Sequence, residues 1–284
     1  MTKTYLDLNT NQTYTKSVVS YSIPPDDNVR VTQMKCSVEI LHMAKEPKGL
    51  LRTRRLDKFS YLDLETGEVR KYRINETREH NLKGLLKSKK MMRHYINNNF
   101  TGSLNEKFIT LTYDPFIKPN IELKCVYDDF RKFLQKLKRR YGNVDYINVP
   151  ELHLSGVWHC HALLRFNDFD KIFVDNDTIV FPAWGNGWTK TKSITSVNNL
   201  GAYFSSKLSF INNAYDVRLE SYPSGMKLFR CSRGILKPET NIMQYHEALG
   251  IVRDSKLSYS QTVEVHNSTG NLLNSITLEE YKKL

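Results

Sequence analysis

Residues 151–161 read Glu-Leu-His-Leu-Ser-Gly-Val-Trp-His-Cys-His, and this stretch decides how the surrounding chain folds. A Ser-Gly pair separates two apolar-rich runs, as the turn of a β-hairpin requires. Side chains alternate along a strand, so His159 and His161 share one face while Cys160 points into the opposite layer. If the hairpin folds about the Ser-Gly pair, Glu151 lies across from His159, with side chains about 5 Å apart. The sequence therefore predicts a hairpin with one carboxylate and two imidazoles on one face.

Such a group of side chains can hold a divalent metal ion. Two imidazoles favour Mn²⁺ or a softer metal over Mg²⁺, and both Mn²⁺ and Mg²⁺ stay candidates. His153 has the same parity as Glu151, so it is either a fourth ligand or a plain turn histidine. Two histidines one residue apart also occur by chance, and the pair alone is a weak signal.

The segments around the hairpin carry clear patterns. Residues 107–113 have the β-branched and aromatic content of a buried strand. Residues 122–141 follow the helical apolar period, and the rest of that segment is strongly positive. A helix over about 197–209 places Tyr203 and Lys207 on the stripe beside its apolar stripe. The order of parts is strand, helix, hairpin and a helix with tyrosine and lysine four residues apart.

The outer parts of the chain are simpler. Residues 1–30 are polar and predict an extended or poorly ordered lead-in. Hairpins are expected at 61–72 and 262–276, and a basic helix at 81–97. The chain divides into an N-terminal extension with a β-hairpin and a basic helix, a catalytic domain, and a C-terminal β-rich extension, at residues 1–105, 106–212 and 213–284.

Charge and composition indicate the partner. Lysine plus arginine exceed aspartate plus glutamate by 12, and aromatic residues make up 11% of the chain. Basic charge with aromatic faces for base stacking is typical of nucleic-acid binding. Four scattered cysteines show no paired metal-finger spacing and fit a reduced, cytoplasmic compartment. The first residues have no apolar stretch like a secretion signal, and no run approaches about 18 apolar residues, so no membrane partner is expected.

Three motifs occur in a specific order: the strand Phe-Ile-Thr-Leu-Thr-Tyr at 108–113, the triplet His159-Cys160-His161, and Tyr203 with Lys207. Together they resemble the rolling-circle replication initiators of small bacterial plasmids and phages, part of the HUH endonuclease superfamily. The resemblance covers about residues 106–210. Residues 99–102 and 230–238 are also similar to the Gram-positive plasmid branch.

The resemblance implies an α+β fold: a central antiparallel β-sheet with flanking helices, the RRM-like palm of HUH endonucleases, with N- and C-terminal extensions. It implies that the metal ligands are Glu151, His159 and His161, and that the helix bearing Tyr203 lies over them. Many phage relatives carry two tyrosines on this helix, whereas only Tyr203 occupies it here. Lys207 falls four positions after Tyr203, where three is the more usual spacing.

The implied activity is metal-dependent nicking of DNA with strand transfer, at a single-stranded or hairpin origin. Tyr203 would attack and form a 5′-phosphotyrosine link. Lys207 would lower the cost of the developing phenolate or bind a neighbouring phosphate. A host DNA polymerase would extend the freed 3′-hydroxyl. A host helicase would unwind the duplex, because the chain has no phosphate loop ending in Gly-Lys-Ser/Thr.

Two rival interpretations stay open. A mobilisation relaxase or single-tyrosine transposase shares the chemistry but acts on another DNA. A non-catalytic basic DNA-binding protein, for instance a repressor or packaging factor, would have structural histidines. Sensitivity to chelation separates the second rival from an enzyme, since salt alone weakens any phosphate-based binding.

Overall fold

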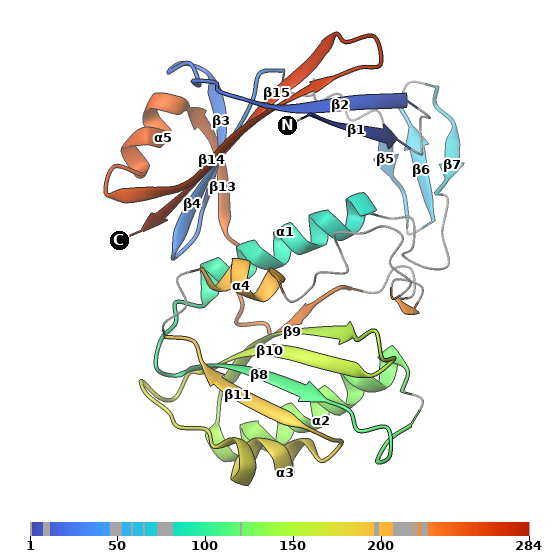
Figure 1. Ribbon diagram of the computed structural model, residues 1–284, viewed down its shortest axis with the longest axis vertical. Coiled ribbons are helices and arrows are strands. Elements are labelled where there is room, and N and C mark those ends of the chain that lie inside the picture. The colour runs from blue at the N-terminus through green and yellow to red at the C-terminus, as the bar shows by residue number, and fades with distance from the viewer. Residues whose placement is uncertain are drawn as a thin grey trace. The chain divides into compact units, whose positions relative to one another are not determined.

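The computed structural model divides the chain into two compact units (Figure 1). One unit is formed by Met1–Arg73 with Pro238–Leu284, and the other by Ile74–Lys237. Segments from both ends of the chain thus share a unit, while the division at 105/106 and 212/213 stays a prediction. The structure describes residues 2–7, 12–45, 53–57, 59–64, 66–72, 82–119, 121–195, 199–206, 218, 221–222 and 227–283.

The first unit is built on an antiparallel sheet whose described strands run in the order β1-β2-β14-β15-β4-β3-β13. Helix α5 packs Ala248 against the buried side chains of Val31 and Ile40. A separate sheet has the order β5-β6-β7. The elements of this unit are β1 (Thr2–Asp7), β2 (Gln12–Val19), β3 (Asn28–Gln33), β4 (Ser37–Met43), β5 (Thr53–Arg55), β6 (Ser60–Asp63), β7 (Val69–Lys71), β13 (Glu239–Gln244), α5 (Tyr245–Ile251), β14 (Ser255–His266) and β15 (Leu272–Lys283).

Two expected hairpins are confirmed in this unit, since β6 pairs with β7 and β14 pairs with β15. The expectation of a poorly ordered lead-in over residues 1–30 is wrong. Strands β1 and β2 pair there, and β2 pairs in turn with β14. The physical reason is that β2 reads Gln-Thr-Tyr-Thr-Lys-Ser-Val-Val, whose β-branched and aromatic residues suit a pleated surface despite their polarity.

The second unit holds an antiparallel sheet whose described strands run in the order β11-β8-β10-β9-β12. The strand expected at 107–113 and the hairpin centred on 151–161 are both present. The elements are α1 (Leu82–Asn99), β8 (Glu106–Thr112), α2 (Leu123–Tyr141), β9 (Val144–Leu152), β10 (Trp158–Phe166), the π-helical turn η1 (Asn176–Val180), α3 (Phe181–Trp184), β11 (Thr189–Ser193), α4 (Leu200–Ser206) and β12 (Arg230–Cys231).

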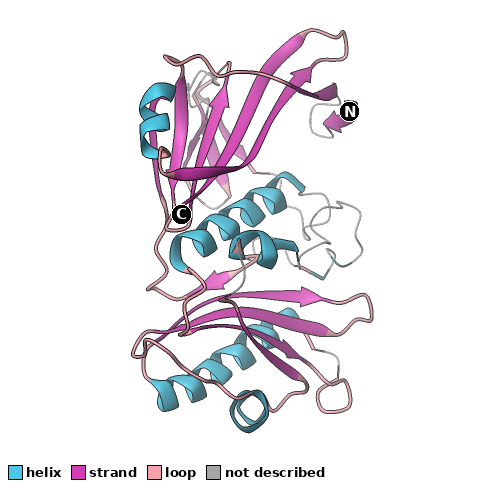
Figure 2. Cartoon of the chain, turned by 60° about the vertical axis from the view of Figure 1, so that its left-hand side comes forward, coloured by secondary structure: helices cyan, strands magenta, loops and turns pink. Residues whose placement is uncertain are grey.

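Helices cover both faces of this five-stranded sheet (Figure 2). Helix α2 packs Phe130 edge-on against Tyr146, on the face that also carries Cys160. Helix α4 lies on the other face, where its Phe204 ring meets the Phe108 ring at 5.6 Å. The expected α+β fold, an antiparallel sheet with flanking helices, is confirmed.

The sequence explains why α2 lies as it does. Phe130, Phe133 and Leu137 recur at helical spacing and are all buried, while lysines and arginines occupy the outer face. Gly142, at φ 71°, ends the helix and donates its N–H to the Lys138 carbonyl. No helix in the described part of the chain has the length and apolar character that crossing a membrane needs.

Candidate active site

The hairpin of β9 and β10 has the register that the sequence predicts. Glu151 pairs directly with His159, and His161 pairs with Val149 one step inward. Gly156 closes the turn with a φ of 79°, a conformation that costs glycine little. The carboxylate and both imidazoles therefore rise from one face of adjacent strands.

Strand β8 supplies a threonine beside each histidine. Thr112 pairs with His159 and Thr110 with His161 across the ladder. The Thr112 hydroxyl lies 3.1 Å from His159 Nδ1, and the Thr110 hydroxyl lies 3.2 Å from His161 Nδ1. Both imidazoles are thus held through Nδ1, which leaves Nε2 as the ring nitrogen that can act on another group. A second partner on the far ring nitrogen is the usual way in which proteins orient metal-binding histidines.

The carboxylate meets one of these Nε2 atoms. Glu151 Oε2 lies 2.9 Å from His161 Nε2. Two ligand atoms that each lie about 2.1 Å from a metal ion, at right angles, are about 3.0 Å apart, so this pair has a suitable separation. Among the described residues, however, no group of three His, Cys, Asp or Glu side chains is gathered around one point as a metal site. The His161–Glu151 pair fits a metal ion, and His159 would complete the set by turning toward it.

The protonation state of His159 also suits a ligand. Burial lowers the pKa of His159 to about 4, and the neighbouring His161 and His153 lower it further than Glu151 raises it. At neutral pH this imidazole is therefore uncharged, as coordination requires.

The two residues nearest in sequence take other positions. Cys160 is fully buried on the opposite face, where burial raises the pKa of its thiol to about 12. This agrees with the alternation predicted from sequence. His153 is exposed at the turn, and its Nδ1 lies 3.0 Å from the Ser155 hydroxyl. Its ring centroid lies 5.5 Å from that of His159, at the rim of the group.

Helix α4 brings Tyr203 to the same face. The ring of Phe108 stacks on His161 at 5.8 Å and meets the Tyr203 ring edge-on at 5.7 Å. Phe204 is buried and anchors the helix against Phe108. The structure therefore joins Tyr203 to the histidine pair through one shared aromatic ring. Lys207, expected one turn further along, lies outside the described residues, as does the beginning of the expected helix at 196–198.

Close packing against α1 fixes α4. The Gly201 N–H donates to Asn97 Oδ1 at 2.9 Å, inside the buried contact of the two helices. A Cβ atom at Gly201 would lie 2.9 Å from the Arg93 carbonyl oxygen, so only glycine allows this approach. At the start of the helix, Asn199 Oδ1 accepts from the Ala202 N–H and caps the first turn. The position of Tyr203 depends on these contacts.

One supporting residue was not predicted from sequence. Tyr222 is buried, and its hydroxyl donates to the Pro150 carbonyl and accepts from the Leu152 N–H. These bonds bracket Glu151 on the strand. Burial raises the pKa of Tyr222, so the hydroxyl keeps the proton that it donates. Nothing in the sequence distinguishes this tyrosine from the other fifteen, because the contact joins residues 70 positions apart.

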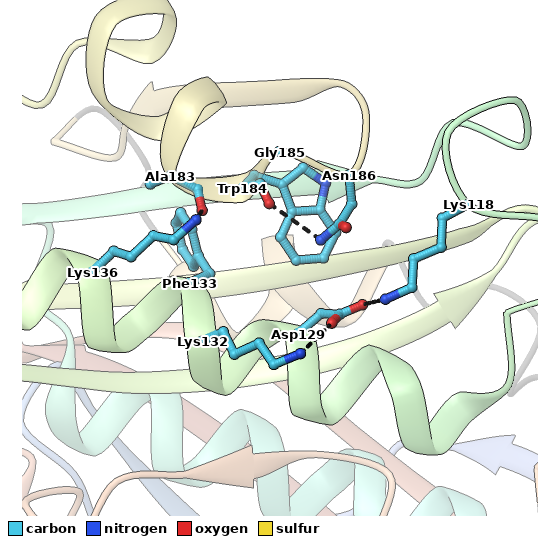
Figure 3. A pocket seen from close by; sticks show the side chains of 9 residues that line it. All are labelled: Lys118, Asp129, Lys132, Phe133, Lys136, Ala183, Trp184, Gly185 and Asn186. Atoms are coloured by element: carbon cyan, nitrogen blue, oxygen red, sulfur yellow. Dashed lines mark hydrogen bonds and ion pairs between the residues drawn. The ribbon is translucent and has the colours of Figure 1, made fainter.

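A pocket of about 310 Å³ lies on the α2 and α3 side of the sheet, away from the histidines (Figure 3). Asp129 is buried there, accepts from the Tyr113 hydroxyl and forms an ion pair with Lys118. Lys132 lies 3.7 Å from the same carboxylate, and Lys136 donates to the Ala183 carbonyl. These lysines are held by partners of their own, so the pocket is not part of the histidine face.

Comparison with known proteins gives one match. A family model of replication-associated proteins, the ORF2 type, matches residues 106–210. The matched stretch runs from β8 through α4 and contains the histidine face and Tyr203. This part of the chain is thus similar to replication-associated proteins, which fits a role in the initiation of DNA replication and contact with DNA. Neither the search of curated proteins nor the search of solved structures gave a match.

Proposed function

We propose that this chain is a metal-dependent DNA nickase and strand transferase that initiates rolling-circle replication of a plasmid or phage, and that it belongs to the HUH endonucleases. The observation that carries the proposal is the shared ring of Phe108, which contacts Tyr203 on one side and His161 on the other. A nucleophile of the right kind thus stands beside a carboxylate and two imidazoles. The match of residues 106–210 to replication-associated proteins supports the same function.

In the proposed reaction the Tyr203 hydroxyl attacks a phosphorus atom of one DNA strand. The bond from tyrosine oxygen to phosphorus forms, and the bond from phosphorus to the 3′-oxygen breaks. The tyrosine loses its proton, the departing 3′-oxygen gains one, and the product is a 5′-phosphotyrosine with a free 3′-hydroxyl. Because the energy of the phosphoester is kept, a later 3′-hydroxyl can displace the tyrosine and rejoin the strand.

The other residues have supporting roles in this proposal. Glu151, His159 and His161 would hold Mn²⁺ or Mg²⁺, and the ion when bound supplies charge that polarises the scissile phosphate. Thr110 and Thr112 orient the imidazoles through Nδ1. Lys207 would bind a neighbouring phosphate. A host polymerase would extend the 3′-hydroxyl, and a host helicase would open the duplex.

The test uses single-stranded and hairpin oligonucleotides tiled across the DNA that encodes the chain, each labelled at its 3′ end. The fragment that stays attached to tyrosine carries this label, so the protein becomes labelled in the presence of Mn²⁺. Tyr203→Phe should abolish the labelled protein, because phenylalanine has no nucleophile. Tyr259→Phe, which alters an exposed tyrosine of the other unit, should leave the yield unchanged. A labelled adduct that persists in Tyr203→Phe contradicts the assignment of the nucleophile.

The same assay separates the non-catalytic rival. Removal of divalent metal with a chelator should abolish the adduct while binding of the oligonucleotide remains. If no oligonucleotide of the set gives an adduct, yet all bind with affinity that falls as salt rises, the chain is a DNA-binding protein without nicking activity. A relaxase or transposase would instead give the adduct only with DNA other than its own replication origin.

A further inference from the structure

The edge strand β11 carries side chains on the histidine face. In the register of the sheet, Lys190 pairs with Thr110, the neighbour of His161. Lys192 pairs with Phe108, the ring that contacts Tyr203. Residues that pair across a ladder point to the same face. Both lysines are exposed, so their side chains stand in solvent beside the candidate active site.

Trp188 continues this row by one more step. Its carbonyl accepts from the Thr112 N–H at 2.8 Å, which extends the ladder to the level of His159. Its side chain is 68% exposed, whereas Trp158 and Trp184 are 4% and 3% exposed. The row therefore begins with a large aromatic face in solvent and ends beside the ring that contacts Tyr203.

The other face of β11 has a purely structural use. The hydroxyls of Thr189 and Thr191 both donate to Asn176 Oδ1 in η1, at 3.1 and 3.3 Å. The alternation thus sends threonines into the protein and places the tryptophan and lysines over the histidine face. Lysines on an edge strand also prevent unwanted pairing with other strands. That function does not account for Trp188, because an exposed indole beside a free edge favours association.

We propose that Trp188, Lys190 and Lys192, named here the β11 track, bind the single DNA strand on which the active site acts. A base would stack on the Trp188 indole, and successive phosphates would pair with the two lysines, the combination that single-strand binding uses. Alternate residues of a strand are about 6.7 Å apart, similar to neighbouring phosphates of an extended strand. This inference rests on the proposed function, because it takes the histidine face as the place where the strand is cut.

Fluorescence tests the aromatic contact directly. The chain has three tryptophans, and Trp188 is the exposed one. Titration of the full chain with an unlabelled oligonucleotide, in a chelator so that no cleavage occurs, should quench its emission. Trp188→Phe should remove the quenching, and Trp188→Ala should weaken binding roughly 5- to 150-fold, as the loss of one stacked base does.

Salt dependence tests the phosphate contacts, with a matched pair of lysines as control. Lys190→Ala/Lys192→Ala should lower the slope of log affinity against log salt by about 1.4, since two phosphate contacts are lost. Lys132→Ala/Lys136→Ala removes the same charge from the α2 side of the sheet (Figure 3) and should leave the slope unchanged. Circular dichroism of each variant shows that it is folded.

The outcomes separate this inference from the proposed function. Unchanged quenching in Trp188→Phe, or an unchanged slope in Lys190→Ala/Lys192→Ala, overturns the β11 track. A loss of slope in Lys132→Ala/Lys136→Ala alone also overturns it, because the strand would then follow the other face. If the track variants behave as expected while the native chain forms no covalent adduct, the binding site stands and the nicking function fails.

Discussion

Replacement of Gly201 by alanine tests how α4 is held over the histidine face. A Cβ atom at this position would lie 2.5 Å from Asn97 Oδ1, 2.7 Å from Arg93 Cγ and 2.9 Å from the Arg93 carbonyl oxygen. The arginine side chain can move, but the carbonyl belongs to the backbone of α1. The helices must therefore separate, which weakens the hydrogen bond from the Gly201 N–H to Asn97.

The opposing energies decide the sign of the effect. Alanine in a helix is favoured over glycine by about 1 kcal/mol. Overpacking of a tight contact costs about 1–3 kcal/mol, and the weakened buried hydrogen bond costs about 1 kcal/mol. The penalties are larger, so Gly201→Ala should destabilise the protein by about 1–3 kcal/mol.

Thermal unfolding measures this effect, at about 2–4 °C for each kcal/mol in a unit of this size. Amide exchange at Tyr203, whose N–H donates to the Asn199 carbonyl, reports the loosening of α4 itself. Gly250→Ala is the matched control, because Gly250 also lies in a helix but a Cβ atom there would have no neighbouring atom within 4 Å. The control should be stabilised by up to about 1 kcal/mol. Equal stabilisation of both variants would refute the packing argument.

Three further predictions concern the site and its support. Tyr222→Phe removes both bonds that bracket Glu151, so it should destabilise the protein by about 1–3 kcal/mol and weaken Mn²⁺ binding measured by calorimetry; unchanged Mn²⁺ affinity would contradict this role. In metal-free protein, His159 should titrate by NMR near pH 4, and because unfolded chains protonate this imidazole near pH 6.5, stability should fall as pH drops between these values; a midpoint near 6.5 would argue against its burial. Glu106 is 2% exposed and accepts from three backbone N–H groups of residues 101–103, so Glu106→Gln should cost about 1–3 kcal/mol in urea unfolding, and a neutral result would contradict this role.

Local patterns in the sequence were enough to predict the candidate site. The pairing of Glu151 with His159 follows from the turn position and the strand period alone, and the structure has this register. The buried placement of Cys160 follows from the same alternation. Tyr203 was identified through motif order, and its contact with Phe108 depends on packing that no local pattern contains. The assignment of catalytic and metal-binding roles stays a prediction.

Long-range pairing was beyond the reach of sequence patterns. A strand near residue 190 was expected, but its place beside β8, and hence the face of Lys190, depends on the order of strands in the sheet. The lead-in was misjudged for a related reason, because β2 is polar and becomes a strand by pairing with β14. Tyr222 acts through two backbone groups of a distant strand, which leave no mark in the sequence.

The strand order of the larger sheet sets a timetable for biosynthesis. Strands β14 and β15 stand between β2 and β4, so the ribbon of β1 and β2 has no neighbour until Ser255–His266 has been translated. At about 5–20 residues per second, the ribosome needs about 10–50 s to reach that point after Val19. Throughout that interval the nascent ribbon exposes an unpaired edge, whereas Ile74–Lys237 leaves the exit tunnel as one uninterrupted stretch.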